Sequence, residues 1–140
     1  MSGDCIFCSI VDGEIPSHTV YEDDTVLAFL DANPLARGHT LVIPKAHHPQ
    51  LQDLPEDDAA GLHEVLHELV GTVEEAVDAD GSNVGLNNGP ASGQEIPHVH
   101  YHIVPRFEGD GGSPIHAVGG AAPDLDDDEL AVVAADIASD

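Results

Sequence analysis

The strongest constraint on the fold is the stretch Pro97–Pro105, where histidines alternate with apolar residues in the order Pro-His-Val-His-Tyr-His-Ile-Val-Pro. A period of two, with β-branched and aromatic residues between the histidines and a proline at each end, predicts a short strand. Alternate residues of a strand share one face, so we expect His98, His100 and His102 in a row, about 6.7 Å apart, opposite a buried apolar face.

A row of three imidazoles indicates chemistry. One ring can attack or accept a proton while its neighbours bind anions or donate protons near neutral pH. Two plainer interpretations are a solvated histidine face and three ligands of one metal ion. The solvated face explains the stretch poorly, because histidine is not a favoured strand former and no other polar residue shares that face.

The composition is strongly acidic. The 140 residues include 27 Asp and Glu against 3 Lys and Arg, which gives a formal net charge of −24, and the acids are spread along the chain. Because 41% of the residues are hydrophobic, the chain is not a disordered acidic polymer. We interpret the charge as a halophilic adaptation, since high salt screens self-repulsion. It excludes nucleic-acid binding through a basic patch.

The chain has no apolar run of 18 residues, and its polar, acidic start is not that of a signal peptide. We therefore expect a soluble cytoplasmic protein with no membrane partner. In that compartment Cys5 and Cys8 are metal ligands or a redox pair rather than a structural disulfide. The redox interpretation is the weaker, because no strand precedes the pair to build a thioredoxin-like unit.

Residues 1–140 predict one α+β domain with a single, mainly antiparallel sheet of about five strands. The elements expected before the C-terminal region are a short helix at Cys5–Val11, a hairpin of Thr19–Glu22 and Thr25–Leu30, a strand at His39–Ile43, a long helix at Pro55–Val77, and strands at Asn83–Asn88 and His98–Val104. Residues 108–123, with five glycines, predict a mobile loop, and residues 124–140 an acidic C-terminal helix.

Two further sets of polar residues need an interpretation. His63 and His67 lie four apart on the long helix, a spacing that suits a metal, but we expect them at surface or boundary positions. The three cations, Arg37, Lys45 and Arg106, all lie in or beside two predicted strands. They have a role at the site, or they fall there by chance.

The chain resembles the histidine triad (HIT) family of nucleotide hydrolases and transferases, whose signature alternates three histidines with apolar residues, as in His98–Val104. The similarity extends from about Cys5 to Arg106. Besides the triad it includes the Cys-x-x-Cys start, Phe29-Leu30-Asp31, Gly38–Lys45 and Asn87–Gln94. The pattern is that of the small dimeric branch, so the resemblance implies a HIT-like fold and a homodimer.

The resemblance also implies a covalent mechanism. His100 would attack the α-phosphorus of a nucleotide, giving a nucleotidyl-histidine that water then hydrolyses. His102 would contact the phosphate and help to protonate the leaving group, while His39 completes the imidazole cluster and His98 orients its neighbours. No metal is required for this step.

The ligand contacts implied by the resemblance fall into two groups. The side chains of Asn87 and Gln94, with the backbone N–H groups of Gly93 and Glu95, would hold the phosphate. Asp31 would accept hydrogen bonds from the ribose, although an acid before Asn-Pro is also a turn former. The base would lie in a slot of apolar residues, each of which core packing explains nearly as well: Ile6, Phe7, Ile10, Phe29 and Leu41.

A metal centre is the last implication of the resemblance. Two thiolates and two imidazoles make a tetrahedral zinc set, and relatives that bind metal supply the residues matching Cys5, Cys8, His47 and His98. The ion would be structural and would pin the N-terminal segment to the sheet. His48 remains an alternative to His47.

We predict a phosphoramidase-type hydrolase that acts at the α-phosphate of purine nucleotide derivatives or other adenylylated small molecules. A dinucleoside polyphosphate hydrolase is an enzymatic alternative. A nucleotide-binding module without turnover and a zinc-centred structural protein are the alternatives outside catalysis.

Overall fold

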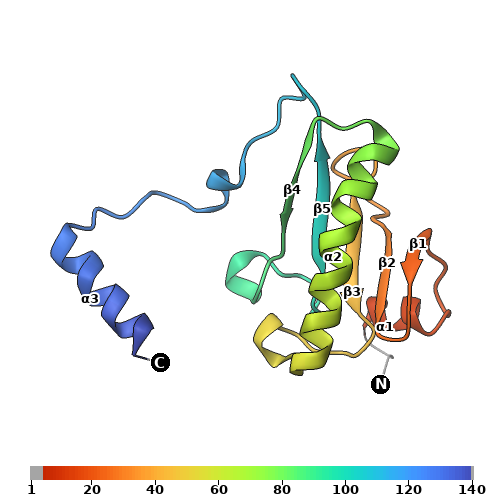
Figure 1. The fold of residues 1–140 in the computed structure, drawn as a ribbon, viewed down its shortest axis with the longest axis horizontal. Coiled ribbons are helices and arrows are strands. Elements are labelled where there is room, and N and C mark those ends of the chain that lie inside the picture. Colours follow the sequence, from red (N-terminus) through yellow and green to blue (C-terminus); the bar gives the residue numbers. More distant parts are fainter. Residues whose placement is uncertain (1–4, 140) are drawn as a thin grey trace.

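The computed structural model describes residues 5–139. Met1–Asp4, whose polar sequence argued against a signal peptide, and Asp140, the last residue of the predicted C-terminal helix, lie outside the described residues. The elements are α1 (Ile6–Val11), β1 (Thr19–Glu22), β2 (Val26–Leu30), β3 (Thr40–Pro44), η1 (Leu51–Asp53), α2 (Glu56–Val77), β4 (Gly81–Gly85), η2 (Pro90–Ser92), β5 (Tyr101–Arg106), η3 (Ile115–Val118) and α3 (Asp127–Ala138) (Figure 1).

The five strands form one antiparallel sheet in the order β1-β2-β3-β5-β4. This confirms the predicted α+β class. Strand β5 lies between β3 and β4, with Leu41 opposite His102 on one side and Gly85 opposite His102 on the other. The third histidine of the triad is therefore held from both sides in the interior of the sheet.

Helix α2 covers one face of the sheet (Figure 1). Its stripe of Leu62, Val65, Leu66, Leu69 and Val73 is buried against strand residues that include Val26, Val42 and Ile103. Three acids in its first turn lie at the positive end of the helix dipole, where a carboxylate is favourable. Because the alternating residues of β5 bury against this helix, the histidine side of the strand faces the other way.

The opposite face carries a second core around α1. Phe7, Phe29, Leu41 and Ile43 are buried there together with both cysteines. Cys5 caps α1, since its Sγ accepts a hydrogen bond from the Cys8 N–H at 3.4 Å. The short helix is thus fixed beside the histidine stretch by its first residues.

The predicted strand His98–Val104 is shifted: β5 begins at Tyr101 and runs through Pro105 to Arg106. The residues before Tyr101 leave the sheet because they form hydrogen bonds with another segment of the chain. The Val99 N–H donates to the carbonyl of His48 at 2.8 Å, and the Pro44 carbonyl accepts from the ring of His98. The predicted apolar side of the stretch is buried at Val99, Tyr101 and Ile103, but burial does not alternate, because His98 and His100 are buried as well.

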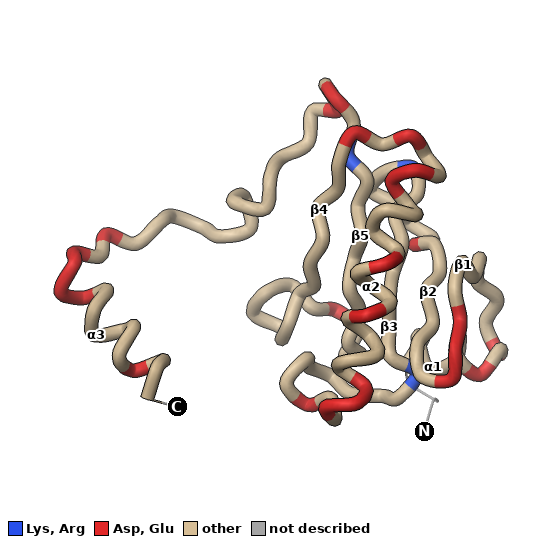
Figure 2. The backbone as a smooth tube through the Cα atoms, in the orientation of Figure 1, with Lys and Arg blue, Asp and Glu red and all other residues tan. Residues whose placement is uncertain are grey.

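The region after Phe107 forms an arm rather than part of the sheet. It contains η3 within the predicted loop, and its helix α3 extends away from the sheet (Figure 1). A capping box between Asp126 and Glu129 closes the N-terminus of α3. Acidic residues are distributed over the loops, α2 and α3 rather than gathered in one patch (Figure 2). Within residues 5–139 no helix has the length and apolarity needed to cross a bilayer.

Candidate active site and metal centre

A cleft of about 640 Å³ opens on the face of the sheet opposite α2. It is bounded by α1, by the loop that follows β2 and by the histidine stretch. The cleft collects most of the residues predicted to bind a nucleotide, namely Ile6, Phe7, Ile10, Phe29, Asp31, Leu41, Asn87, Gly93, Glu95, His100 and His102. The structure therefore brings the predicted apolar slot, the acid, the phosphate loop and two triad histidines to one place.

The ring of His100 presents one nitrogen to this cleft. Its Nδ1 lies 2.7 Å from the carbonyl of His98, so Nδ1–H donates there and Nε2 keeps a lone pair. The ring of Phe7 packs edge-on against it, with centroids 4.9 Å apart. Only 8% of the residue is exposed. Backbone and aromatic contacts thus hold this ring in one orientation.

His39 and His102 form a hydrogen-bonded pair whose proton positions follow from the backbone. The Leu35 N–H donates to His39 Nδ1 at 3.0 Å, so a neutral His39 carries its proton on Nε2. That proton is donated to His102 Nδ1 at 2.9 Å. His102 therefore keeps its own proton on Nε2, where it is a hydrogen-bond donor.

Both rings of this pair are uncharged near pH 7. Burial lowers the pKa of His39, against an opposing effect of the Asp31 carboxylate. Burial also lowers the pKa of His102, and the neighbouring rings of His100 and His39 act in the same direction, so that it falls to about 4.

Asp31 forms a turn and also lines the cleft. Its Oδ1 accepts the Asn33 N–H at 2.8 Å, which is the hydrogen bond of a turn former. Its Oδ2 lies 3.7 Å from His39 Nε2, and the residue lines the cleft. One carboxylate oxygen builds the loop and the other remains near the site.

The side chain of Gln94 is used differently from the prediction. Its Oε1 accepts the Gly89 N–H at 2.7 Å, and its Nε2 donates to the carbonyls of Pro49 and Ile96. These bonds shape the loop and commit the side chain away from a phosphate. Asn87 and the backbone at Gly93 and Glu95 line the cleft, so a phosphate would be held by these groups alone.

The predicted metal ligands converge at the start of α1. The ligand atoms of Cys5, Cys8, His47 and His98 all lie within 4.8 Å of one another. Cys8 Sγ is 3.2 Å from His47 Nδ1, and His98 Nδ1 is 3.4 Å from Cys5 Sγ and 3.3 Å from His47 Nδ1. Ligands of a tetrahedral zinc ion, with Zn–N near 2.0 Å and Zn–S near 2.3 Å, are separated by roughly 3.3–3.8 Å. The residues fit the ion.

The chemistry of the donor set agrees with the geometry. His98 donates Nε2–H to the Pro44 carbonyl at 2.8 Å, so its lone pair on Nδ1 faces the thiols. Burial and the adjacent Cys5 raise the pKa of Cys8 to about 11, so the thiolate form requires a compensating cation. The cluster takes His47 rather than His48. The carbonyl of His98 accepts a hydrogen bond from the His100 ring at 2.7 Å, while the His98 ring belongs to the cluster.

The cations lie outside the cleft. Lys45 pairs with Glu22 at 2.7 Å, and Arg106 bonds Asp110, while Arg37 is exposed. Sequence reasoning also missed the role of His63, whose Nε2 lies 2.8 Å from the hydroxyl of the buried Tyr101. The spacing His63-Glu64-x-x-His67 matches a zinc-protease helix motif. Neither histidine belongs to a metal-capable cluster of the described residues, and both are exposed.

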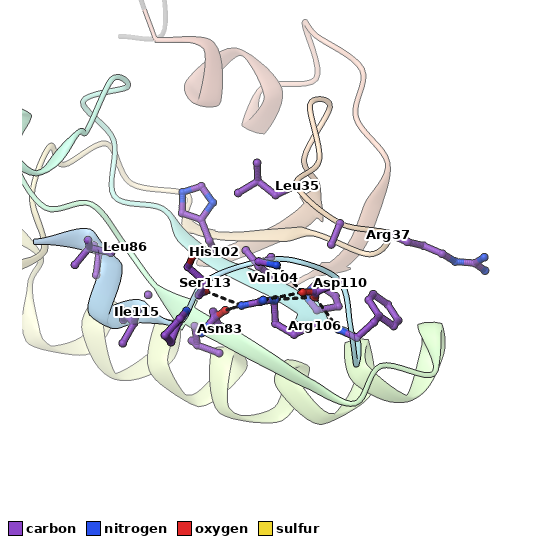
Figure 3. Close-up of a pocket in the computed structure, with 18 of the residues that line it drawn as sticks. Leu35, Arg37, Asn83, Leu86, His102, Val104, Arg106, Asp110, Ser113 and Ile115 are labelled. Atoms are coloured by element: carbon purple, nitrogen blue, oxygen red, sulfur yellow. Dashed lines mark hydrogen bonds and ion pairs between the residues drawn. The ribbon is translucent and has the colours of Figure 1, made fainter.

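A second cavity, of about 610 Å³, was not predicted. It lies beside His102, between β4, β5 and the first part of the arm (Figure 3). No motif marks it in the sequence, because its walls come from residues on separate elements. The glycine-rich composition of residues 108–123 suggested a mobile loop instead of a wall.

Comparisons with known proteins agree with this geometry. Residues 12–109 match the family model described as the HIT domain. The chain is 49% identical over 107 residues to an uncharacterized HIT-like protein of Methanocaldococcus jannaschii, covering 76% of this chain and 82% of that protein. It is 43% identical over 110 residues to the adenylylsulfatase HINT3 of Arabidopsis thaliana, covering 79% of this chain but only 56% of that protein.

Among solved structures, a Zn-bound histidine triad family protein from Mycobacterium smegmatis has the same fold, with a TM-score of 0.76 and 38% identity. The alignment covers 99% of each chain. The sequence motifs, the fold and these matches lead to one conclusion: the chain belongs to the HIT family.

Proposed function

We propose that the protein is a nucleotide hydrolase of the phosphoramidase type, acting at the α-phosphate of purine nucleotide derivatives. The observation that carries the proposal is the orientation of His100, whose Nδ1 is committed to a backbone carbonyl while Nε2 is left free beside the cleft. The adenylylsulfatase named among the relatives supports an adenylyl group as the part that is recognised.

In the first step, His100 Nε2 attacks the α-phosphorus and a P–N(His) bond forms. The bond from phosphorus to the leaving nitrogen breaks, and its electron pair stays with that nitrogen. His102 lies beside the attacking ring, with ring centroids 5.1 Å apart. An anionic phosphate next to His102 favours the protonated imidazole, so His102 can pass a proton to the departing amine.

In the second step, water attacks the same phosphorus and the P–N(His) bond breaks, returning the electron pair to His100 Nε2. The attacking water gives up one proton to His102, which restores the proton that was passed to the amine. The products are the nucleoside monophosphate and the free amine. The carbonyl of His98 stabilises the charged imidazole of the intermediate, because it accepts the proton on His100 Nδ1.

The rest of the cleft would position the substrate. Asn87 and the backbone of Gly93 and Glu95 would bind the phosphate oxygens, Asp31 the ribose, and the apolar residues beside α1 the base. Gly93 has a φ of 103°, which glycine adopts most readily, and this conformation brings its backbone beside Asn87. A purine ring is flat and apolar enough for a slot bordered by Phe7 and Phe29.

Zinc would be held by Cys5, Cys8, His47 and His98 as a structural ion. It would supply a covalent link between α1 and the segment that carries His100. The chemical step would then use the residues of the cleft together with His39.

We also infer a cytoplasmic, salt-adapted homodimer. The helix of the arm is the argument for a second copy. Leu130, Val133 and Ile137 form an apolar side of α3, and all three are exposed in the single chain. An isolated helix of 12 residues is marginal in water and is stabilised by packing its apolar side. Two protomers of charge −24 repel, so association would strengthen with salt.

The direct test is to incubate the protein with an adenosine 5′-phosphoramidate, quench it and search for an adenylylated peptide by mass spectrometry. The adduct is expected on the peptide that contains His100, and His100→Asn is expected to abolish it. Turnover of the phosphoramidate by His100→Asn at the wild-type rate would refute the mechanism. Preference for a dinucleoside polyphosphate, or tight AMP binding without turnover of either compound, would support one of the alternatives.

A further inference from the structure

The second cavity adjoins the proposed reaction centre. His102 and Asn87 line both cavities, whereas His100 lines only the nucleotide cleft. A phosphorus atom attacked by His100 and contacted by His102 and Asn87 would therefore lie where the two cavities meet. The group that leaves departs on the side away from the nucleophile, and the second cavity begins at His102 and Asn87, the side chains that would contact the phosphate.

The walls of this cavity are mainly apolar. Aliphatic side chains from the loop before β3, from β4 and the residue after it, from β5 and from the arm line it (Figure 3): Leu35, Val84, Leu86, Val104, Ile115 and Val118. Leu35, Ile115 and Val118 are more than half exposed, so the cavity is open to solvent on their side. Apolar surface of this kind favours an apolar ligand by about 25 cal/mol for each Å² removed from water. It offers little to a hydrophilic group.

The charged residues at this cavity do not offer a free cation to its interior. Arg106 donates to both carboxylate oxygens of Asp110, and also to Asn83 and to the Ser113 carbonyl, as Figure 3 shows. Arg37 is exposed and its side chain extends away from the other lining residues (Figure 3). A polyphosphate chain carries several negative charges, and nothing inside the cavity would balance them.

The arm wall of the cavity is fixed to the sheet. Besides the Arg106 bond to Ser113, a Cβ atom at Gly112 would overlap the guanidinium group of Arg106, so glycine allows the arm to approach this closely. Ile115 then reaches β4, because its Cδ1 lies 3.8 Å from where a Cβ of Gly85 would stand. The wall lies beyond residue 109, where the match to the family domain ends.

We propose that the second cavity binds the leaving group of the substrate, and that this group is an uncharged apolar one, such as the alkyl or aryl chain of a primary amine joined to AMP. The proposal rests on the function proposed above and specifies its substrate class. Ile115 and Val118 would determine specificity without contacting the reacting atoms.

The test compares AMP phosphoramidates of n-hexylamine and methylamine, whose nitrogen leaving groups are chemically alike. We expect kcat/KM for the hexyl compound to be at least about tenfold higher, since each buried methylene contributes about 0.8 kcal/mol. Val118→Asp and Ile115→Asp are expected to remove that advantage, so that the hexyl and methyl compounds have similar kcat/KM values. Val132→Asp, on the exposed helix α3 and outside the cavity, is the charge-matched control and is expected to change neither value.

Equal kcat/KM values for the two compounds, or equal losses on both in Val118→Asp, would overturn the proposal. So would a Val118→Asp variant that changes only the oligomeric state, which would assign this surface to a contact between copies. Calorimetry with the methyl and hexyl phosphodiesters of AMP separates the subsite from the reaction. If no phosphoramidate is turned over, tighter binding of the hexyl ester to the wild type than to Val118→Asp supports the subsite and refutes only the hydrolase.

Discussion

Two clusters of imidazoles lie four residues apart on one segment of the chain, and they have different chemistry. Around His98, four ligand atoms converge. Four of the separations between pairs of these atoms are 3.2–3.5 Å, as around a tetrahedral ion. Around His102, the nearest partner is His39 at 2.9 Å, which is a hydrogen bond between two rings. Asp31, His39 and His102 are also close enough together to be considered as metal ligands.

The difference depends on the second nitrogen of each ring. His98 gives Nε2–H to the Pro44 carbonyl, so Nδ1 is a bare ligand facing two thiols. His102 instead accepts a hydrogen bond at Nδ1 from the Nε2–H of His39, so its own proton is on Nε2. The same residue type therefore presents either a lone pair suited to a metal ion or an N–H suited to an acceptor, according to which atom is bonded to its other nitrogen.

The sharpest way to break this contrast is to remove a thiol. Cys8→Ser, or treatment of the wild type with a strong chelator, is expected to release zinc and to lower the free energy of unfolding by several kcal/mol, on the order of 5. Metal analysis and thermal denaturation measure both effects. His39→Asn is the control, since the contrast predicts that it retains a full complement of zinc. Zinc loss in that variant would show that the two clusters do not act independently.

The next test breaks the other cluster. His39→Asn removes the ring that fixes the proton of His102, so kcat for an AMP phosphoramidate is expected to fall by about 10²-fold. KM is expected to change little, because His39 does not line the cleft. Unchanged kcat in a folded, zinc-loaded variant would show that the ring pair has no part in the reaction.

A third prediction concerns Asp31, which lies beside the His102 cluster. Asn at this position can still accept the Asn33 N–H that forms the turn, but it loses the charge that would bind two ribose hydroxyls. Asp31→Asn is therefore expected to weaken AMP binding by about tenfold with the melting temperature preserved. A 2′-deoxy analogue of AMP is expected to bind the wild type and Asp31→Asn with more similar affinities than AMP does. If calorimetry shows the same difference in affinity for the deoxy analogue as for AMP, the ribose hydroxyls are not the contact of Asp31.

The last prediction concerns the pH dependence of stability. The pKa of His102 is lowered to about 4 by burial and by the His100 and His39 rings, against the effect of Asp31, whereas the unfolded chain takes up this proton near pH 6.5. The contribution of the uncharged His102 to the free energy of unfolding is fully present above about pH 6.5 and is lost as the pH falls toward 4.

The slope for one such group is at most about 1.4 kcal/mol per pH unit. His102→Asn is expected to show a shallower loss of stability than the wild type between pH 6.5 and 4, as measured by chemical denaturation with zinc present. Parallel curves would mean that this ring titrates alike in the folded and unfolded states.

Much of the fold could be predicted because its signals are local. The apolar residues Val99, Tyr101 and Ile103 alternate within one short stretch. The stripe from Leu62 to Val73 lies within a few turns of one helix. The strand boundaries were less predictable. β5 starts at Tyr101 because the residues before it bond to a loop some 50 residues earlier in the chain, and no local pattern reports such a partner.

By itself the sequence determined the elements, the family and the set of residues that could meet at a site, since these follow from periodicity and from motifs of adjacent residues. Only the tertiary structure decided what each polar atom does. It turned Gln94 inward to its own loop, bonded one ring nitrogen of His98 to the distant Pro44 carbonyl and one of His102 to the ring of His39, and placed the arm beside β4 and β5, where it lines a second cavity. The reason is physical: hydrogen-bond partners and cavity walls are supplied by residues far apart in the chain, and only folding brings them within contact distance.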